Sequence, residues 1–174
     1  MHFPGCEAIA VNGMRSLTGI SGLQSRRLEK NSRTSILEID SWMPSRTEAI
    51  SPFVDRLMLL IEGSQCVLGE EPDVELALRE ALANAVLHGN QERGVIKVHV
   101  RCRCEPLGEI SIVVTDQGKG FDFRNVIGGG FDCGDAGEHG RGLPLMKTYM
   151  DNVHFERGGS EVHMCKRARS RLYW

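Results

Sequence analysis

The stretch EPDVELALREALANAVLHGN, residues 71 to 90, decides the fold of the chain around it. Its apolar residues recur at helical spacing, which predicts a helix with one buried face: Val74, Leu78, Ala81, Leu82 and Ala85. Pro72 suits the first turn of such a helix, and the carboxylates beside it favour the positive end of the helix dipole. Gly89 predicts a cap at its end. We therefore expect one long helix packed against the core.

A polar stripe runs along the edge of that buried face. At about 100° per residue, Glu80, Asn84 and His88 fall on one line. A carboxylate and a carboxamide one turn apart beside a core can hold a divalent cation and accept a proton. Such residues also occur on ordinary half-exposed helices, and His88 fits a capping or packing role equally well. The choice between a functional site and a solvated face depends on the other motifs.

Length, charge and cysteine content restrict the class of protein. A chain of 174 residues is expected to form one domain with one core. Its net charge of −2 gives no general attraction to nucleic acid or to an anionic membrane. No apolar run reaches the ~18–20 residues of a membrane span, and the N-terminus does not resemble a signal peptide. The six cysteines form no zinc pattern, so we expect reduced thiols in a cytoplasmic protein. From the charge and the lack of a long apolar run, we expect that the protein binds neither nucleic acid nor membrane.

Periodicity predicts an α/β (α+β) domain over residues 34–167, followed by a basic tail at 168–174. Residues 1–33 have little periodicity and are expected to be a mobile extension with a short helix near 23–29. The elements expected inside the domain are strand 34–40, helix 51–63, the central helix, strands 94–105 and 109–115, a helix near 142–150, and strands 153–157 and 161–166. Because hairpins join the later strands, we expect a two-layer sandwich with a mixed, mostly antiparallel sheet and three helices on one face.

A second motif, DQGKGFD at residues 116–122, follows an apolar strand. A buried carboxylate such as Asp116 at a strand end needs a hydrogen-bond donor, and the exocyclic amine of adenine is one. Gly118 and Gly120 allow the backbone to come close to a flat base. The same letters also fit an ordinary Asp-Gly turn, so the motif alone is weak.

A third motif, GRGL at residues 140–143, lies just before a predicted helix. It follows a glycine-rich segment at 123–138, which is long enough for a lid over a site. Free N–H groups at the start of a helix suit the phosphates of a nucleotide. A glycine-rich loop that simply meets a helix would look the same.

Taken together, the order and spacing of these motifs resemble the GHKL ATPase superfamily, whose members have the Bergerat fold with a glycine-rich ATP lid. Within it, the chain is most similar to the anti-sigma factor serine/threonine kinases, a group with a histidine kinase-like ATPase domain. The segments that carry the resemblance are EALANAVLHG at 80–89, DQGKGFD at 116–122, GRGLPLMKTYMD at 140–151 and GSEVHMCK at 159–166.

The resemblance implies ATP and Mg²⁺ as ligands. Asn84 would be the Mg²⁺ ligand, and Glu80 would be the catalytic base that takes the proton of an attacking hydroxyl. Asp116 would bind the adenine amine, and Ser160 keeps a hydroxyl where the group more often has threonine. Residues 140–143 would hold the phosphates under the lid. The nucleotide-binding residues implied are Asn84, Asp116, Gly118, Gly120, Gly140, Arg141, Gly142, Leu143 and Ser160.

The function implied is that of an ATP-dependent protein serine/threonine kinase. Members of the group sequester a sigma factor and phosphorylate an anti-anti-sigma protein of the STAS type, and the resemblance also favours a homodimer. The alternative is a non-catalytic ATP-binding regulatory module, or a separate ATPase subunit of a two-component-like signalling system. Glu80 decides between a kinase and a passive binder, because only the kinase needs a base beside the metal ligand.

Overall fold

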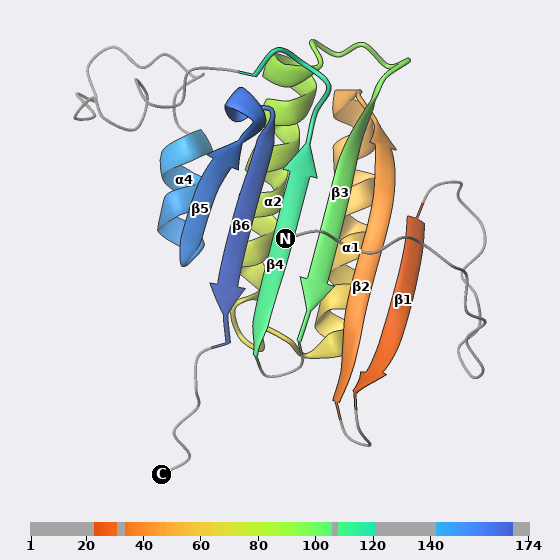
Figure 1. Ribbon diagram of the computed structural model, residues 1–174, viewed down its shortest axis with the longest axis vertical. Coiled ribbons are helices and arrows are strands. Elements are labelled where there is room, and N and C mark those ends of the chain that lie inside the picture. Colours follow the sequence, from red (N-terminus) through yellow and green to blue (C-terminus); the bar gives the residue numbers. More distant parts are fainter. Residues whose placement is uncertain (1–22, 31–33, 106–107, 121–141, 169–174) are drawn as a thin grey trace.

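Six antiparallel strands form one sheet in the order β1-β2-β3-β4-β6-β5 (Figure 1). The computed structural model describes residues 23–30, 34–105, 108–120 and 142–168. The strands are β1 (Leu23–Lys30), β2 (Thr34–Pro44), β3 (Lys97–Cys104), β4 (Glu109–Thr115), β5 (Asn152–Glu156) and β6 (Glu161–Arg167). A mixed sheet was expected, but every strand pair among the described residues is antiparallel. Short hairpin connections, such as those between β3 and β4 and between β5 and β6, favour this pattern.

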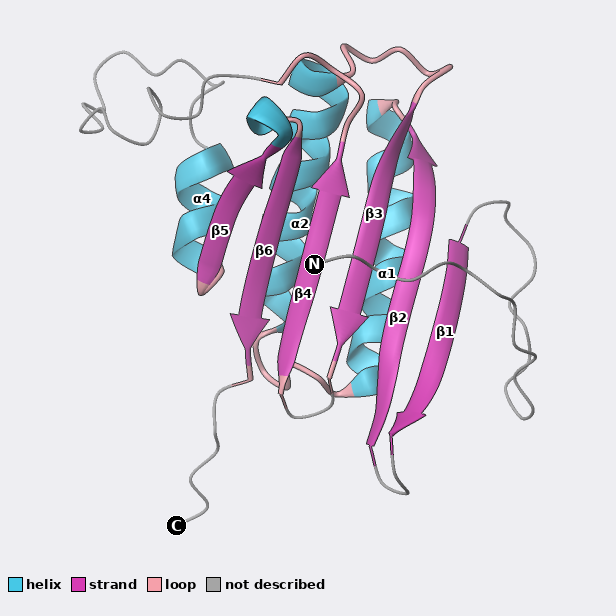
Figure 2. Cartoon of the chain, in the orientation of Figure 1, coloured by secondary structure: helices cyan, strands magenta, loops and turns pink. Residues whose placement is uncertain are grey.

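The helices lie together on one face of the sheet and make the second layer (Figure 2). They are α1 (Ile50–Ser64), α2 (Glu71–Asn84) and α4 (Gly142–Tyr149), with short turns of helix at Thr47–Ala49, Ala85–Gly89 and Arg157–Gly159. The predicted two-layer α+β sandwich is therefore confirmed. The predicted lid at 123–138 and most of the basic tail lie outside the described residues.

The expected short helix near residues 23–29 is wrong. Leu23–Lys30 is instead the edge strand β1, which pairs along its whole length with β2. The local sequence LQSRRLEK shows no apolar alternation, so the strand depends on the unpaired backbone groups that the edge of β2 offers. The boundary that we placed at residue 34 stays a prediction.

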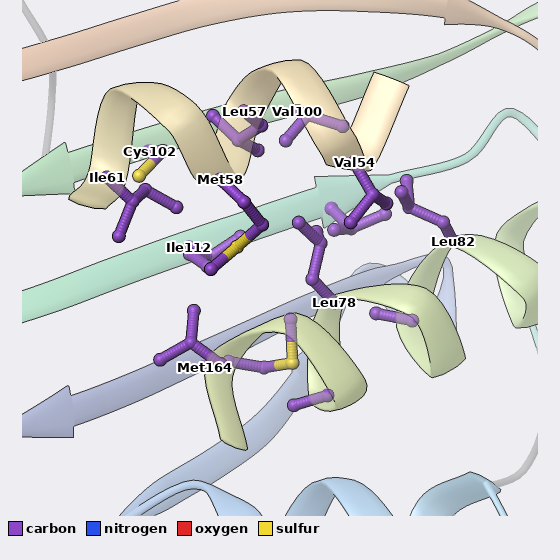
Figure 3. Close-up of a cluster of buried hydrophobic side chains, with 14 of the residues drawn as sticks. Val54, Leu57, Met58, Ile61, Leu78, Leu82, Val100, Cys102, Ile112 and Met164 are labelled. Atoms are coloured by element: carbon purple, nitrogen blue, oxygen red, sulfur yellow. The ribbon is translucent and has the colours of Figure 1, made fainter. Parts of the chain in front are cut away.

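The core fills the space between the helices and the sheet (Figure 3). Even-numbered residues of β3 point toward the helices and odd-numbered residues point to the open face, as the alternation predicted. The side chains labelled in Figure 3 belong to this core: Val54, Leu57, Met58 and Ile61 of α1, Leu78 and Leu82 of α2, and Val100, Cys102, Ile112 and Met164 of the sheet. Each buried side chain of this size contributes roughly 1.5–3 kcal/mol, which fixes α2 firmly in place.

Two cysteines correct the expectation of reduced thiols. Cys66 and Cys104, both fully buried, form a disulfide with a Cα–Cα distance of 5.6 Å. The bond joins the loop after α1 to the end of β3, which are 38 residues apart in sequence. Pairing over such a separation cannot be read from cysteine spacing. Cys102 is free and buried, and burial raises the pKa of its thiol to about 12.

Lys166 ties the start of α2 and the end of α4 to β6. Its side chain is buried and its Nζ lies 3.0 Å from Glu70 and 2.9 Å from Asp73, at the start of α2. It also donates a hydrogen bond to the Tyr149 carbonyl at the end of α4, at 2.7 Å. Burial would lower the pKa of Lys166, but its two carboxylate partners outweigh burial and raise the pKa. This lysine therefore fixes the positions of α2 and α4 relative to the sheet.

Candidate functional site

The first part of the site is formed where α2 passes the start of α4. Glu80 and Asn84 are half-buried and lie one helical turn apart on α2. A Cβ atom added to Gly142, the first residue of α4, would lie 2.8 Å from Glu80 Oε2 and 3.2 Å from Asn84 Nδ2. The carboxylate, the carboxamide and a helix N-terminus thus meet at a position that only a glycine can occupy without crowding.

The predicted stripe ends at Asn84, because the helix changes its hydrogen-bonding pattern there. Residues Ala85–Gly89 form a π-turn, in which the Asn90 N–H donates to the Ala85 carbonyl at 2.8 Å. His88 lies within this turn and is exposed, whereas Glu80 and Asn84 are half-buried. Sequence reasoning assumed one continuous α-helix to Gly89 and could not detect this change.

The π-turn brings Gly89 against the second motif. A Cβ atom on Gly89 would lie 2.6 Å from Asp116 Oδ1, and one on Gly118 would collide with the Gly89 carbonyl oxygen. Gly89 has a negative φ, so its role is close approach and not the cap that we predicted. Gly120 has a φ of +72°, and a side chain there would collide with the Gly158 carbonyl. The glycines of the motif are therefore needed for backbone packing around Asp116.

Asp116 stands at the end of β4 with its side chain half-buried. Its N–H donates to the Ser160 carbonyl at 2.9 Å, and its Oδ1 accepts the Gly118 N–H at 2.7 Å. Within the described ranges its Oδ2 has no hydrogen-bond partner, so it can accept a bond from an amine. Burial raises the pKa of Asp116, while the Gly118 N–H and the positive charge of Arg157 oppose the rise.

Asn90 is a structural residue of the site that sequence reasoning missed. It is 1% exposed, and its Oδ1 accepts the Gln117 N–H at 2.8 Å. Its Nδ2 is buried without a hydrogen-bond partner in the described part of the protein. The side chain thus ties the end of the π-turn to the segment that contains Asp116. No sequence pattern indicates this role, because the burial of Asn90 and its partner are set by the folded chain.

A cavity of ≈ 540 Å³ opens beside Asp116 on the face of the sheet that the helices leave free. Its lining includes Asp116, Gly118 and Ser160 of the predicted site, together with Trp42 and Arg101 of the open face. Ser160 is buried, and its Oγ donates to the Arg157 carbonyl at 3.1 Å.

The predicted residues fall into two groups and a remainder. Glu80, Asn84 and Gly142 meet in one place, with Leu143 half-buried in the first turn of α4. Asp116, Gly118, Gly120 and Ser160 meet in a second place. Gly89 and Asn90 join the two along the chain. Gly140 and Arg141 lie outside the described residues.

Comparison with known proteins adds a family to this geometry. The sequence profile described as "Histidine kinase-like ATPase domain" matches residues 43–166, which include both groups of site residues. The chain belongs to the family of histidine kinase-like ATPase domains. None of the helices in the described part of this ATPase domain has the length and apolarity to span a bilayer.

Curated relatives narrow the family further. An anti-sigma F factor of Clostridium botulinum (strain Eklund 17B / Type B) is 36% identical over 107 residues, which are 58% of this chain and 73% of the relative. An anti-sigma F factor of Clostridium novyi (strain NT) is 28% identical over 130 residues, 70% of this chain and 83% of the relative. The serine-protein kinase RsbW of Staphylococcus aureus (strain bovine RF122 / ET3-1) is 26% identical over 141 residues, 73% and 87% of the two chains. The resemblance to the anti-sigma kinase group is confirmed.

The residues of the ATPase domain fit a nucleotide with a divalent cation. Gly89 and Gly118 let the backbone pack closely around Asp116, and Gly142 lets α4 begin beside Glu80 and Asn84. Asn84 supplies a carboxamide oxygen of the hard type that Mg²⁺ prefers, next to the N-terminus of α4, where free N–H groups suit phosphate. Asp116 Oδ2 is positioned to accept a hydrogen bond from a base amine.

Proposed function

We propose that the chain is an ATP-dependent protein serine/threonine kinase of the anti-sigma factor type, active with Mg²⁺ in the cytoplasm. Its partners would be a sigma factor, which it sequesters as a homodimer, and a STAS-type anti-anti-sigma protein, which it phosphorylates. The names of its relatives support a sigma factor as one partner and a serine as the phosphorylated residue. The observation that carries the proposal is the convergence of Glu80 and Asn84 on Gly142.

We infer different tasks for the two side chains. Asn84 would hold Mg²⁺ through its Oδ1, and the bound ion would neutralise charge on the phosphate oxygens. Glu80 lies one turn earlier on α2 and beside the start of α4, where it can accept the proton of an acceptor serine hydroxyl. Gly142 and Leu143 bring N–H groups without intrahelical partners to the start of α4, and Pro144 supplies none because it has no N–H.

The second group of residues would select the base. Asp116 Oδ2 would accept a hydrogen bond from the adenine amine, and Ser160 would fix the Asp116 backbone through its carbonyl. Gly118 and Gly120 let the backbone pack closely against the Gly89 and Gly158 carbonyls and so fix the segment that carries Asp116. A guanine base presents a carbonyl where adenine presents the amine, so two acceptors would face each other. Preference for ATP over GTP follows from this arrangement.

The test is phosphate transfer by matched variants of α2. Purified protein is incubated with Mg²⁺, ATP labelled in its γ-phosphate, and a STAS-type acceptor, while calorimetry measures nucleotide binding separately. Glu80→Gln should bind ATP but lose roughly 100-fold or more in transfer, since a positioned base is worth about 10²–10⁴. Glu75→Gln is the control, because Glu75 is also half-buried on α2 but pairs with Arg79.

Two outcomes test the kinase hypothesis against the alternative, and a third tests the metal ligand. Transfer by Glu80→Gln at the wild-type rate would show that Glu80 is not the base. Tight ATP binding by the wild type, with no transfer to any serine acceptor, would favour the non-catalytic regulatory module. Asn84→Ala should lose Mg²⁺-dependent nucleotide binding in either case, because the metal ligand serves both functions.

A further inference from the structure

The β5–β6 hairpin places two histidines and two glutamates on the open face of the sheet. His154 is directly opposite His163, and Glu156 is directly opposite Glu161. Side chains directly opposite each other in an antiparallel pair share one face and lie ~4.5–5.5 Å apart at Cβ. Val162 and Met164 alternate with these residues and point into the core, so all four polar side chains face solvent or the cavity beside Asp116.

We propose that His154, Glu156 and His163 form a binding site for a divalent transition metal of the zinc class. One donor atom from each residue can be chosen so that the three lie within 4.8 Å of one another. Two neutral imidazoles and a carboxylate are a donor set that suits Zn²⁺ and its first-row neighbours, whereas Mg²⁺ and Ca²⁺ prefer oxygen ligands throughout.

The spacing already approaches that of a tetrahedral centre. Glu156 Oε1 lies 3.5 Å from His154 Nε2, and Glu156 Oε2 lies 3.6 Å from His163 Nε2. Bonds of about 2.0–2.1 Å in tetrahedral geometry place neighbouring donor atoms about 3.3 Å apart. The carboxylate thus needs to move by only a few tenths of an ångström toward each ring. The two rings are stacked with their centroids 4.6 Å apart, and rotation about their side-chain bonds would turn both nitrogens to one ion.

Local charge favours a cation at this position. In the part of the chain that the structure describes, the ion pairs of Glu156 are with the two histidines, and no lysine or arginine competes for it. Glu161 Oε1 forms a hydrogen bond with His163 Nε2 at 2.8 Å, which a bound metal would replace, and Glu161 Oε2 accepts the Thr115 hydroxyl at 2.8 Å. Glu161 adds a second negative charge beside the ligands, although Arg101 at 3.6 Å and Arg157 at 3.8 Å neutralise part of it.

The proposed metal site is open to solvent and lies where a bound ion would stabilise the edge of the sheet. The side chains of His154 and Glu156 are each 54% exposed, so an ion can reach them from solvent. β5 is an edge strand of the sheet, and the metal would pin it to β6. The turn between these strands contains Gly158, against which Gly120 packs, and leads to Ser160, which binds the Asp116 N–H. Metal would therefore steady the turn beside the proposed base pocket.

The experiment titrates metal-free full-length protein with Co²⁺ as a visible probe, followed by competition with Zn²⁺. The variants are His154→Gln and Glu156→Gln, with His88→Gln and Glu105→Gln as controls from exposed positions off the hairpin. The wild type should bind one Co²⁺ with the absorption of a four-coordinate nitrogen and oxygen site, without a thiolate band. Each hairpin variant should lose at least about tenfold in affinity, since even residues outside the ligand set cost about 10–100-fold.

The metal affinities of the wild type and the four variants, compared with one another, test whether the hairpin binds the metal. Loss in both hairpin variants with unchanged controls supports it. Equal affinity in all five proteins, a thiolate spectrum, or no binding by the wild type would each overturn the proposal. Circular dichroism of the metal-free variants should show unchanged melting, because the substituted side chains are exposed. A rise in melting temperature with Zn²⁺ should occur in the wild type and the controls alone.

Discussion

Replacement of Gly142 by alanine separates the proposed chemistry from the stability of the fold. The added Cβ would lie 2.8 Å from Glu80 Oε2, which is about 0.6 Å inside the 3.4 Å where ordinary contact begins. Its distance of 3.2 Å from Asn84 Nδ2 is also tight. The carboxylate is the far end of a flexible side chain, so Glu80 would rotate away while the backbone stays in place.

The two effects of this substitution differ in size. Alanine at the start of α4 gains up to about 1 kcal/mol of helix propensity over glycine, which offsets the crowding, so the melting temperature should change by no more than about 2–4 °C. Displacement of a catalytic group by about 1 Å can cost about 100-fold in rate. We therefore expect phosphate transfer to fall about 10- to 100-fold in Gly142→Ala.

The assay measures transfer, ATP binding and thermal melting on the same preparation. Gly63→Ala is the matched control, because Gly63 lies near the end of α1 and a Cβ atom added there would meet nothing within 4 Å. It should melt slightly higher than the wild type and keep full activity. Full transfer by Gly142→Ala would show that Glu80 need not occupy the position seen beside α4, and the assignment of the base would fail.

Three further substitutions test the framework of the site. Gly118→Ala should lose about 1–3 kcal/mol of unfolding free energy and ATP binding, since its Cβ would collide with the Gly89 carbonyl; urea denaturation measures the first and calorimetry the second. Lys166→Met should lose about 2–4 kcal/mol in thermal denaturation, because two carboxylates lose their buried cation. Asp116→Asn should abolish ATP binding yet raise the melting temperature at neutral pH. The pKa of Asp116 is higher in the folded than in the unfolded protein, so the wild type loses folding stability as the pH rises above the unfolded-state pKa. Asparagine carries no charge and avoids this loss. The higher melting temperature of the variant should therefore disappear in acid.

Much of the fold follows from local periodicity, and the exceptions depend on distant partners. The alternation in β3 and β4 and the apolar face of α2 predict their burial correctly, because one face of each element meets the core. β1 has no such pattern and is a strand only because β2 offers it an edge. The disulfide between Cys66 and Cys104 likewise depends on a contact between segments 38 residues apart.

The residues of the candidate site also differ in whether local sequence or a distant partner determines them. Glu80 and Asn84 were predictable because their relation is local to one helix, and Asp116 because it ends an apolar strand. Asn90 and Lys166 were missed because their partners, the Gln117 N–H and the carboxylates at the start of α2, come from other segments. No spacing rule gives such a contact, since a buried polar residue is defined by what it meets in the folded chain.

The glycine that ends EALANAVLHG and the glycines of the DQGKGFD motif form one structural unit. Gly89 must lack a side chain because Asp116 fills that space, and Gly118 must lack one because the Gly89 carbonyl fills the other. The π-turn sets the position of that carbonyl, and Asn90 holds it to Gln117. Backbone atoms and a fixed carboxylate occupy these spaces. A side chain at either glycine therefore cannot be accommodated by making a neighbouring side chain smaller. The end of α2 and the loop after β4 therefore position the proposed metal ligand and the proposed base pocket as a single unit, which explains why HG and DxGxG occur together in this chain.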